Sequence, residues 1–282
     1  MDKDKEIIKH SATCQISNQI DLMDRKVFNV LLYNSFPNIK TEGNFKIELN
    51  KLLNYLEVTT RNYDFIKNIL TNLVQTAVTF NVLNKVTSDI KIISSWAVCG
   101  LLSWAEIKDG IITYQFPEYL QKKLAESEMY ARIKLSIQNK LSSKYALALY
   151  ELCLDYYDSN RRKGLTPKIR VNQLKRLLIG TMLRYPDFFE FNRKVIKRAV
   201  LEIEKESDLK IKVKYFKELR AVAYIQFEIT KVQKNNIEKE IIKENNLTPE
   251  DLLSEKEKLD KIKLKEMLQQ YKKRYQIDHT IN

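Results

Sequence analysis

Four basic residues crowd together at positions 193–198, within the stretch 185–215, whose sequence is YPDFFEFNRKVIKRAVLEIEKESDLKIKVKY. Arg193 and Arg198 carry planar guanidinium groups that can hydrogen-bond the edge of a guanine, and Lys194 and Lys197 carry compact charges that suit phosphate. When this segment is wound as a helix, all four bases fall on its exposed side. Their type and spacing predict contact with a polyanion, and with DNA in particular.

The other side of the same helix, residues 188–206, is apolar. Asp187 followed by Glu190 is typical of a capping box at the start of a helix. The winding places these residues inward: Phe188, Phe191, Val195, Ile196, Ala199 and Ile203. The helix is therefore expected to pack on a core with one side and to present bases with the other.

The bland alternative is a solvated helix face on which bases pair with acids at i,i+4 spacing. The spacing argues against it, because Arg193 meets Lys197 four residues on and Lys194 meets Arg198. Like charges at this spacing are destabilising unless an anion relieves them. We therefore expect the cluster to lack acidic partners and to bind DNA.

Two further basic groups flank this helix in the sequence. Arg161, Arg162 and Lys163 lie in an expected loop, and Lys217 and Arg220 lie in an expected hairpin turn. If the surrounding unit is a winged helix, both groups should converge on the same DNA and hold phosphates.

An equivalent helix is expected earlier in the chain, within TTRNYDFIKNILTNLVQTAV. Its outer side offers Arg61, Asn62, Lys67 and Asn68, followed by Asn72, and is therefore polar but nearly neutral. We expect it to make a weaker, secondary DNA contact.

The elements that must position these residues occur in the same order twice: helix, strand, helix, helix and hairpin. In the first half, helical periodicity covers 21–36, alternation follows in NFKIEL, Asn50 is expected to cap a short helix, and Asp109-Gly110 predicts a two-residue hairpin. In the second half, Ser142 and Asn172 are the expected caps and Gly180 the expected stop.

One pair of segments makes the repetition explicit. IELNKLLNYL, which begins at Ile47, aligns with IRVNQLKRLL, which begins at Ile169, so the offset is 122 residues. The order of elements is that of a winged helix, whose third helix usually enters the major groove. We expect a mainly α fold with small β-hairpins (α+β), made of two tandem winged-helix domains plus a C-terminal helix.

The charge is unevenly distributed along the 282 residues. Of the net +13, residues 1–126 carry +1, residues 127–230 carry +10 and residues 231–282 carry +2. We predict an N-terminal winged-helix domain over 1–126 for dimerisation and secondary DNA contact, the main DNA-contacting winged helix over 127–230, and a charged tail over 231–282. Within that tail, a helix is expected from about 249 to 276.

Several kinds of chemistry are missing from the sequence. It has no G-x-x-x-x-G-K-[ST] nucleotide loop and no G-x-S-x-G element, and His10 and His279 are its only histidines. The three cysteines form no CxxC pair, and no apolar run approaches a membrane span. We expect a cytoplasmic, non-enzymatic protein with no metal, no cofactor and no membrane contact.

Several blocks of the sequence resemble one family. KHSATCQISNQIDLMDRKVFNVLLYNSF, NYDFIKNILTNLVQTAVTFN, SSKYALALYEL and FFEFNRKVIKRAVLEIEKESDLKIKV are similar, in order and spacing, to plasmid replication initiators of the theta-replicating, iteron-binding type (the initiator replication protein family). The resemblance covers about residues 9–229, and the tail departs from it.

The resemblance implies two winged-helix domains that grip successive stretches of a directly repeated origin element, the iteron. Carried over by position, the main base contacts fall on Asn192, Arg193, Lys197 and Arg198. The resemblance also implies a monomer that helps to open the origin, a homodimer that binds an operator and represses its own gene, and recruitment of the host initiator and the replicative helicase.

Two other functions fit the same residues. A transcriptional repressor built from duplicated winged helices would bind a short inverted repeat and would not support plasmid maintenance. An interaction protein could use its basic patch to bind an acidic protein partner, in which case it would not bind DNA even at low salt.

Overall fold

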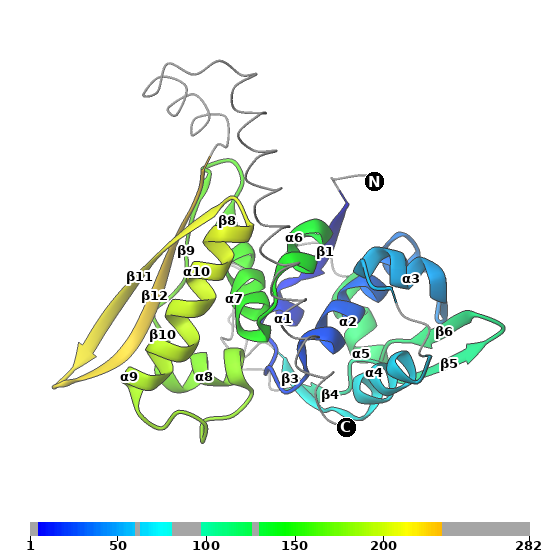
Figure 1. Cartoon of the computed structure of the whole chain (residues 1–282), viewed down its shortest axis with the longest axis horizontal. Helices are drawn as coiled ribbons and strands as arrows, with labels where there is room; N and C mark the ends of the chain where they lie inside the picture. Colours follow the sequence, from blue (N-terminus) through cyan, green and yellow to red (C-terminus); the bar gives the residue numbers. More distant parts are fainter. Residues whose placement is uncertain (1–4, 60–62, 81–96, 126–129, 233–282) are drawn as a thin grey trace, which may run out of the picture. The chain divides into compact units, whose positions relative to one another are not determined.

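The computed structural model of the chain describes residues 5–59, 63–80, 97–125 and 130–232 (Figure 1). Residues up to Lys231 form one compact unit. Its first part contains β1 (Glu6–His10), α1 (Ser11–Cys14), α2 (Leu22–Ser35), β2 (Phe45–Glu48), α3 (Leu49–Leu56), α4 (Tyr63–Gln75), β3 (Val78–Phe80), β4 (Ala97–Cys99), β5 (Trp104–Lys108), β6 (Ile111–Gln115) and α5 (Glu118–Ala125).

The second part of this unit follows α5 in the chain. It contains β7 (Tyr130–Lys134), α6 (Leu135–Lys140), α7 (Lys144–Asp155), β8 (Tyr157–Asp158), β9 (Lys163–Leu165), β10 (Ile169–Arg170), α8 (Val171–Ile179), α9 (Phe188–Phe191), a π-helical turn (Asn192–Ile196), α10 (Lys197–Glu206), β11 (Leu209–Glu218) and β12 (Ala221–Lys231).

The order helix, strand, helix, helix and hairpin occurs twice, as the sequence predicts. The first repeat comprises α2, β2, α3, α4 and the hairpin β5–β6, and the second comprises α7, β10, α8, the helix from α9 to α10, and the hairpin β11–β12. The aligned pairs Ile47 and Ile169, and Leu52 and Leu174, are all buried. The two repeats therefore use the same sequence positions to fill their cores.

In each repeat, the strand before the short helix pairs with the hairpin. β2 pairs antiparallel with β6, and β10 pairs antiparallel with β12. The Asp109-Gly110 turn joins β5 to β6 with φ values of 50° and 74°, the left-handed values that a type I′ turn requires. This turn confirms the hairpin predicted from the sequence.

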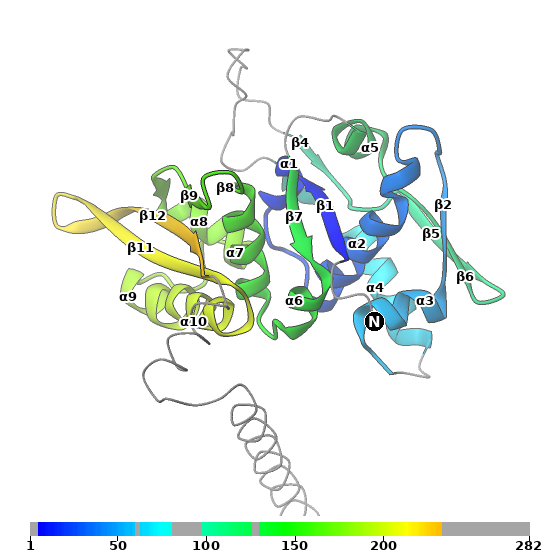
Figure 2. The same cartoon turned by 90° about the horizontal axis from the view of Figure 1, so that it is seen from above.

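One pairing between strands that are far apart in the chain was not predicted from the sequence. β1 pairs antiparallel with β7 over five residues, so the start of the chain lies beside the segment that precedes α7 (Figure 2). Strands β8 and β9 extend the sheet of the second repeat, because β8 pairs with β9 and β9 pairs with β12.

The predicted helix caps need correction. Asn50 and Asn172 are exposed second residues of α3 and α8, whose N-caps are Glu48 and Arg170. The N-cap of α7 is Ser143 rather than Ser142, and Ser143 Oγ accepts hydrogen bonds from two backbone N–H groups of the first turn. In all three cases the N-cap lies one or two residues away from the predicted position.

Other boundaries are confirmed. Gly180 ends α8 with a φ of 87°. An added Cβ there would lie 2.5 Å from the Asn18 carbonyl oxygen. The predicted tail helix at 249–276 lies outside the described residues. No helix in the described part of the chain is long and apolar enough to cross a membrane.

Candidate nucleic-acid interface

The basic helix, Phe188–Glu206, is continuous through α9, the π-helical turn and α10. Its first turn is capped by Asp187, whose Oδ2 accepts a hydrogen bond from the Glu190 N–H at 3.0 Å. Before the cap, the buried ammonium of Lys175 donates to the carbonyl oxygens of Tyr185 and Pro186 at 2.7 and 3.3 Å. The entry into the helix is therefore fixed by polar contacts from inside the domain.

The two faces of the basic helix match the sequence prediction. Phe191, Val195, Ile196, Ala199 and Ile203 are buried, and Phe188 is half-buried. The opposite face exposes Arg193, Lys194, Lys197 and Arg198. All four predicted bases thus lie on one accessible surface.

The prediction that these bases lack acidic partners is wrong for two of them. Glu190 Oε1 lies 2.8 Å from Arg193 Nη2, and Glu190 Oε2 lies 2.6 Å from Lys194 Nζ. Hydrogen bonds from Lys194 and Arg193 hold the pKa of Glu190 below its ordinary value. The sequence reading compared each base only with the residue four places on, whereas Glu190 lies three and four places before these bases.

The pairing divides the four bases into two kinds. Arg193 donates to Glu190 through both Nε and Nη2, which holds its guanidinium in one orientation. No described residue forms an ion pair with Lys197 or Arg198. Lys197 and Arg198 are therefore open to phosphate, and Arg193 is oriented in advance.

The helix is also fixed to the hairpin behind it. The Tyr215 hydroxyl of β11 donates to Asn192 Oδ1 at 2.9 Å, and its ring meets Phe188 edge to face at 6.0 Å. Asn192 opens the π-helical turn, a local irregularity that often occurs at functional sites. The sequence reading assigned Asn192 to DNA and did not identify Tyr215 as its partner.

The hairpin β11–β12 carries a second row of bases. Lys217 lies next to its tip and Arg220 lies in the turn itself, beside the fully exposed Leu219. The sequence reading missed two bases beside the tip half of the hairpin, where Lys168 lies 4.3 Å from the Phe216 ring centroid and Arg170 lies 5.1 Å from that of Tyr224. These rings hold the cations against the hairpin by cation–π attraction.

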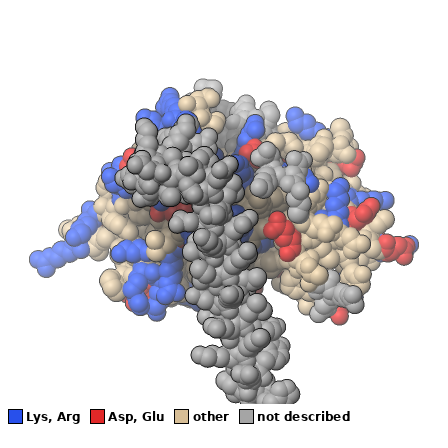
Figure 3. Space-filling model, turned by 45° about the horizontal axis from the view of Figure 1, so that its top comes forward, with Lys and Arg blue, Asp and Glu red and all other residues tan. Residues whose placement is uncertain are grey.

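The distribution of charge over the surface agrees with this placement. In Figure 3 the Lys and Arg side chains gather on the left, the side on which Figure 1 places β11 and β12, and the right-hand part shows both signs.

The third predicted group, Arg161, Arg162 and Lys163, does not join the hairpin tip. These residues follow β8 and enter β9, and Lys163 pairs with Thr230 at the far end of β12 (Figure 1). The tip of the hairpin is nine residues back along that strand, roughly 30 Å at the usual rise of a strand. The two predicted groups therefore lie near opposite ends of the hairpin, and Arg161 is paired with Asp158 at 3.4 Å. Their contact with the same DNA stays a prediction.

The equivalent helix of the first repeat, α4, carries less charge. Lys67 is exposed but paired with Asp64 at 2.9 Å, and Asn68 is exposed beside it. Arg61 and Asn62 lie outside the described residues.

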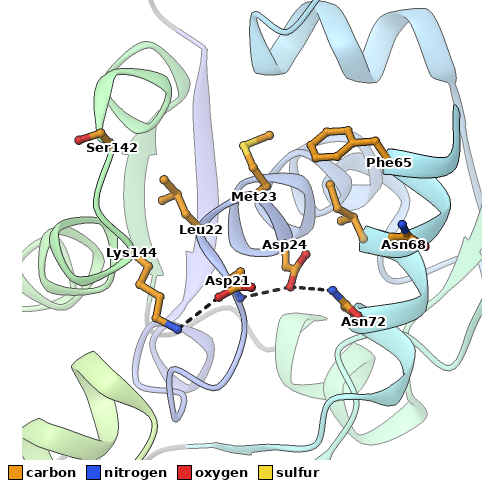
Figure 4. Close-up of a pocket in the computed structure, with 10 residues that line it drawn as sticks. Asp21, Leu22, Met23, Asp24, Phe65, Asn68, Asn72, Ser142 and Lys144 are labelled. Carbon is orange, nitrogen blue, oxygen red and sulfur yellow. Dashed lines mark hydrogen bonds and ion pairs between the residues drawn. The ribbon is translucent and has the colours of Figure 1, made fainter. Parts of the chain in front are cut away.

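The surface next to α4 is acidic rather than basic. Figure 4 shows a pocket of about 530 Å³ between α4, the start of α2 and Lys144. Asp24 Oδ2 accepts from the Asp21 N–H at 3.2 Å and from Asn72 Nδ2 at 3.4 Å, and Lys144 Nζ lies 3.4 Å from Asp21 Oδ1. Burial raises the pKa of Asp24. These contacts fix α4 to α2 and leave little positive charge for phosphate.

A buried charge network, which the sequence reading also missed, joins the two repeats. Glu151 of α7 accepts from Lys9 at 2.8 Å, from Arg25 at 2.7 and 2.9 Å, and from Asn29 at 2.7 Å. The Lys9, Arg25 and Glu151 side chains are completely buried. Burial acts to raise the pKa of Glu151, but the charges of Arg25 and Lys9 outweigh it and hold that pKa below its ordinary value. The network thus fixes α2 against α7.

Comparison with protein families identifies two winged-helix domains. Residues 6–154 match the model described as "Initiator Replication protein, WH1", and residues 170–229 match "Initiator Rep protein, WH2". Together these matches cover well over half of the chain. The chain belongs to the initiator replication protein family. This confirms both the family and the two winged-helix domains predicted from the sequence.

The relatives of this initiator-family chain are distant. It is 28% identical to the PI protein of Escherichia coli over 134 residues, which span 43% of this chain and 44% of that protein. It resembles the crystal structure of the Pi initiator protein in complex with iteron DNA, with a TM-score of 0.63 and 20% identity over 83% of this chain and all of that one. The structure of domains 2 and 3 of RctB matches 75% of this chain and 83% of its own, with a TM-score of 0.41 and 12% identity.

The family matches also bear on the internal boundaries. The N-terminal match continues through β7, α6 and nearly all of α7, which the sequence reading placed in the second domain. The division at residue 126 stays a prediction.

Proposed function

We propose that this chain is a plasmid replication initiator that acts by binding directly repeated origin elements, or iterons, as double-stranded DNA. The observation that carries the proposal is the basic face of the helix Phe188–Glu206 together with the bases of the β11–β12 hairpin, in a chain of the initiator family. The Pi initiator was crystallised with iteron DNA, which supports DNA as the ligand.

In this proposal the basic helix enters the major groove. Arg193, oriented by Glu190, hydrogen-bonds a guanine edge, while Lys194, Lys197 and Arg198 neutralise phosphates. Binding of Arg193 to DNA competes with its bond to Glu190. When the base in the groove does not match, Arg193 stays bonded to the Glu190 carboxylate. Glu190 thereby contributes to selectivity.

The hairpin holds the flanking backbone. Lys217 and Arg220 at its tip, and Lys168 and Arg170 on the nearby rings of Phe216 and Tyr224, contact phosphates. The bond between Tyr215 and Asn192 keeps the hairpin and the helix at a fixed spacing. Arg161, Arg162 and Lys163 contact only DNA that extends past the far end of the sheet.

The first repeat makes the weaker contact through Lys67, Asn68 and the preceding Arg61 and Asn62. The two winged helices together would grip about 20 base pairs of one iteron. Further roles belong to the same proposal and rest on the family membership: opening of the origin, recruitment of the host initiator and replicative helicase, and repression of its own gene by a homodimer.

Binding to the DNA that flanks the gene tests the proposal. The full chain is titrated into labelled duplexes from that region at several salt concentrations, and it should prefer direct repeats with an affinity that falls steeply as salt rises. Absence of any sequence preference, or of any DNA binding at low salt, would refute it and favour a protein partner.

A replication assay separates an initiator from a repressor. A plasmid that carries the repeats and the adjoining AT-rich tract, but no other origin, should be maintained only in cells that express this chain. If the chain binds an inverted repeat alone and never maintains such a plasmid, it is a winged-helix repressor.

A further inference from the structure

One aromatic side chain at the start of the basic helix faces away from the core. Of the three phenylalanines there, Phe191 is fully buried and Phe188 packs against Tyr215, but Phe189 is 67% exposed. The turn just before the helix exposes Leu183 as well, at 89%. Exposed apolar side chains therefore occur at and just before the N-terminal end of the helix that carries the four bases.

The position of Phe189 places it on the reading surface. Arg193 lies four residues on, so the two side chains are neighbours on the same face of the helix. The N-terminal residues of a recognition helix are those that contact base edges in the major groove. A ring at this position therefore meets the same groove as the guanidinium beside it.

The charges near Phe189 indicate what its ring contacts. Arg193 and Lys194 lie on the next turn, and Arg184 lies in the turn that leads into the helix. An apolar protein partner would have to cover these cations, whereas the major groove of DNA offers anionic phosphates together with one apolar group. That group is the C5-methyl of thymine, which phenylalanine contacts in direct readout.

We infer that Phe189 is a specificity-determining residue that reads a thymine methyl group next to the base contacted by Arg193. This inference rests on the proposed DNA-binding function and deepens it, because the basic cluster alone accounts for guanine and phosphate contacts. The repeat should therefore contain a thymine adjacent to the guanine that depends on Arg193.

The test removes single methyl groups from the DNA. The bound sequence is first selected from random duplexes with the full chain, and each thymine is then replaced in turn by deoxyuridine, which lacks only the methyl. The wild-type chain should lose about fourfold in affinity at one thymine, the factor that corresponds to roughly 0.8 kcal/mol for one buried methyl-sized group.

Two variants complete the experiment. Phe189→Ala should bind the thymine duplex more weakly and should lose the response to deoxyuridine at that position. Leu201→Ala is the matched control, because Leu201 is also 67% exposed on the same helix but lies twelve residues further on. It should respond to deoxyuridine as the wild type does. Since both side chains are exposed, circular dichroism should show unchanged folding.

The outcomes separate this inference from the proposed function. If the wild type selects no sequence, the proposed function fails. If it selects a sequence, but the same deoxyuridine effect persists in Phe189→Ala or no thymine matters, only the role of Phe189 is overturned.

Discussion

The two repeats bury apolar side chains at the same helical spacing, but they expose different charged side chains. In α4 the inner residues Ile66, Ile69, Leu70 and Leu73 fill a core, as Val195, Ala199 and Ile203 do in the second repeat. Outside, α4 presents a lysine already paired with Asp64, and an asparagine that donates to the buried carboxylate of Asp24. The basic helix presents four bases, and only Arg193 and Lys194 pair with Glu190.

The hairpins differ in the same way. The tip of β5–β6 is Asp109-Gly110, and the tip of β11–β12 is Leu219-Arg220 with Lys217 beside it. The inner face of a winged helix is dictated by packing, but its outer face is free to vary. A duplicated fold can therefore place strong DNA recognition in one copy and leave the other for weaker contact.

The largest expected effect falls on the network that joins the two repeats. Glu151→Gln leaves the buried charges of Lys9 and Arg25 without a counter-ion, and we expect a loss of roughly 3–5 kcal/mol in the free energy of unfolding. Urea denaturation followed by circular dichroism measures it. Glu118→Gln, which removes only an exposed pair with Lys122, should leave the midpoint unchanged.

Acid should reduce the contribution of the same carboxyl group. Because the pKa of Glu151 is lower in the folded protein than its ordinary value of 4.5, its stabilisation is complete above that value and is lost as the pH falls through the folded pKa. The stability difference between wild type and Glu151→Gln should therefore shrink between neutral pH and pH values below 4.5. A difference that does not change with pH would contradict the network.

Replacing Arg193 tests DNA contact by the second repeat of the fold. Arg193→Ala should cost roughly 1–3 kcal/mol in binding to the iteron and relax selectivity at one base pair. Competition binding with single-base variants of the repeat measures both effects. Unchanged binding would show that the reading face lies elsewhere.

Removing the acid that holds this arginine should act in the opposite direction on affinity. Glu190→Gln frees Arg193 and Lys194 from their partner, so binding to random duplexes should become tighter and the preference for the repeat should fall. The ratio of the two dissociation constants is the measurement. A higher preference for the repeat would contradict the role given to Glu190.

The smallest effect is expected in the first repeat. Lys67→Ala should weaken binding less than about twofold, because its charge is already paired on an exposed surface. Lys197→Ala is the matched comparison and should reduce the salt slope of binding by about one. Equal effects of the two variants would remove the distinction between the repeats.

Much of the fold could be predicted because its signals are local. The repeated order of elements, the Asp109-Gly110 turn, the stop at Gly180 and the division of the basic helix into two faces all follow from residues within a few positions of one another. The N-caps lie one or two residues from the predicted positions, because the extended backbone before each helix determines where the helix begins.

Contacts between distant residues were not accessible from the sequence. The pairing of β1 with β7, the bond from Tyr215 to Asn192 and the network around Glu151 join residues that are far apart in the chain. No periodicity marks such pairs, and a buried lysine and arginine resemble exposed ones until their partner is found.

The sequence by itself determined which side of each helix is apolar and where positive charge concentrates, since both depend on residue type and helical spacing. The tertiary structure decided which bases act together. Lys168 and Arg170 lie beside the aromatic rings of the hairpin, and residues 161–163 lie at the far end of β12. The Glu151 carboxylate joins the two repeats. Residue types give the charges, but the fold sets the distances between the charged side chains.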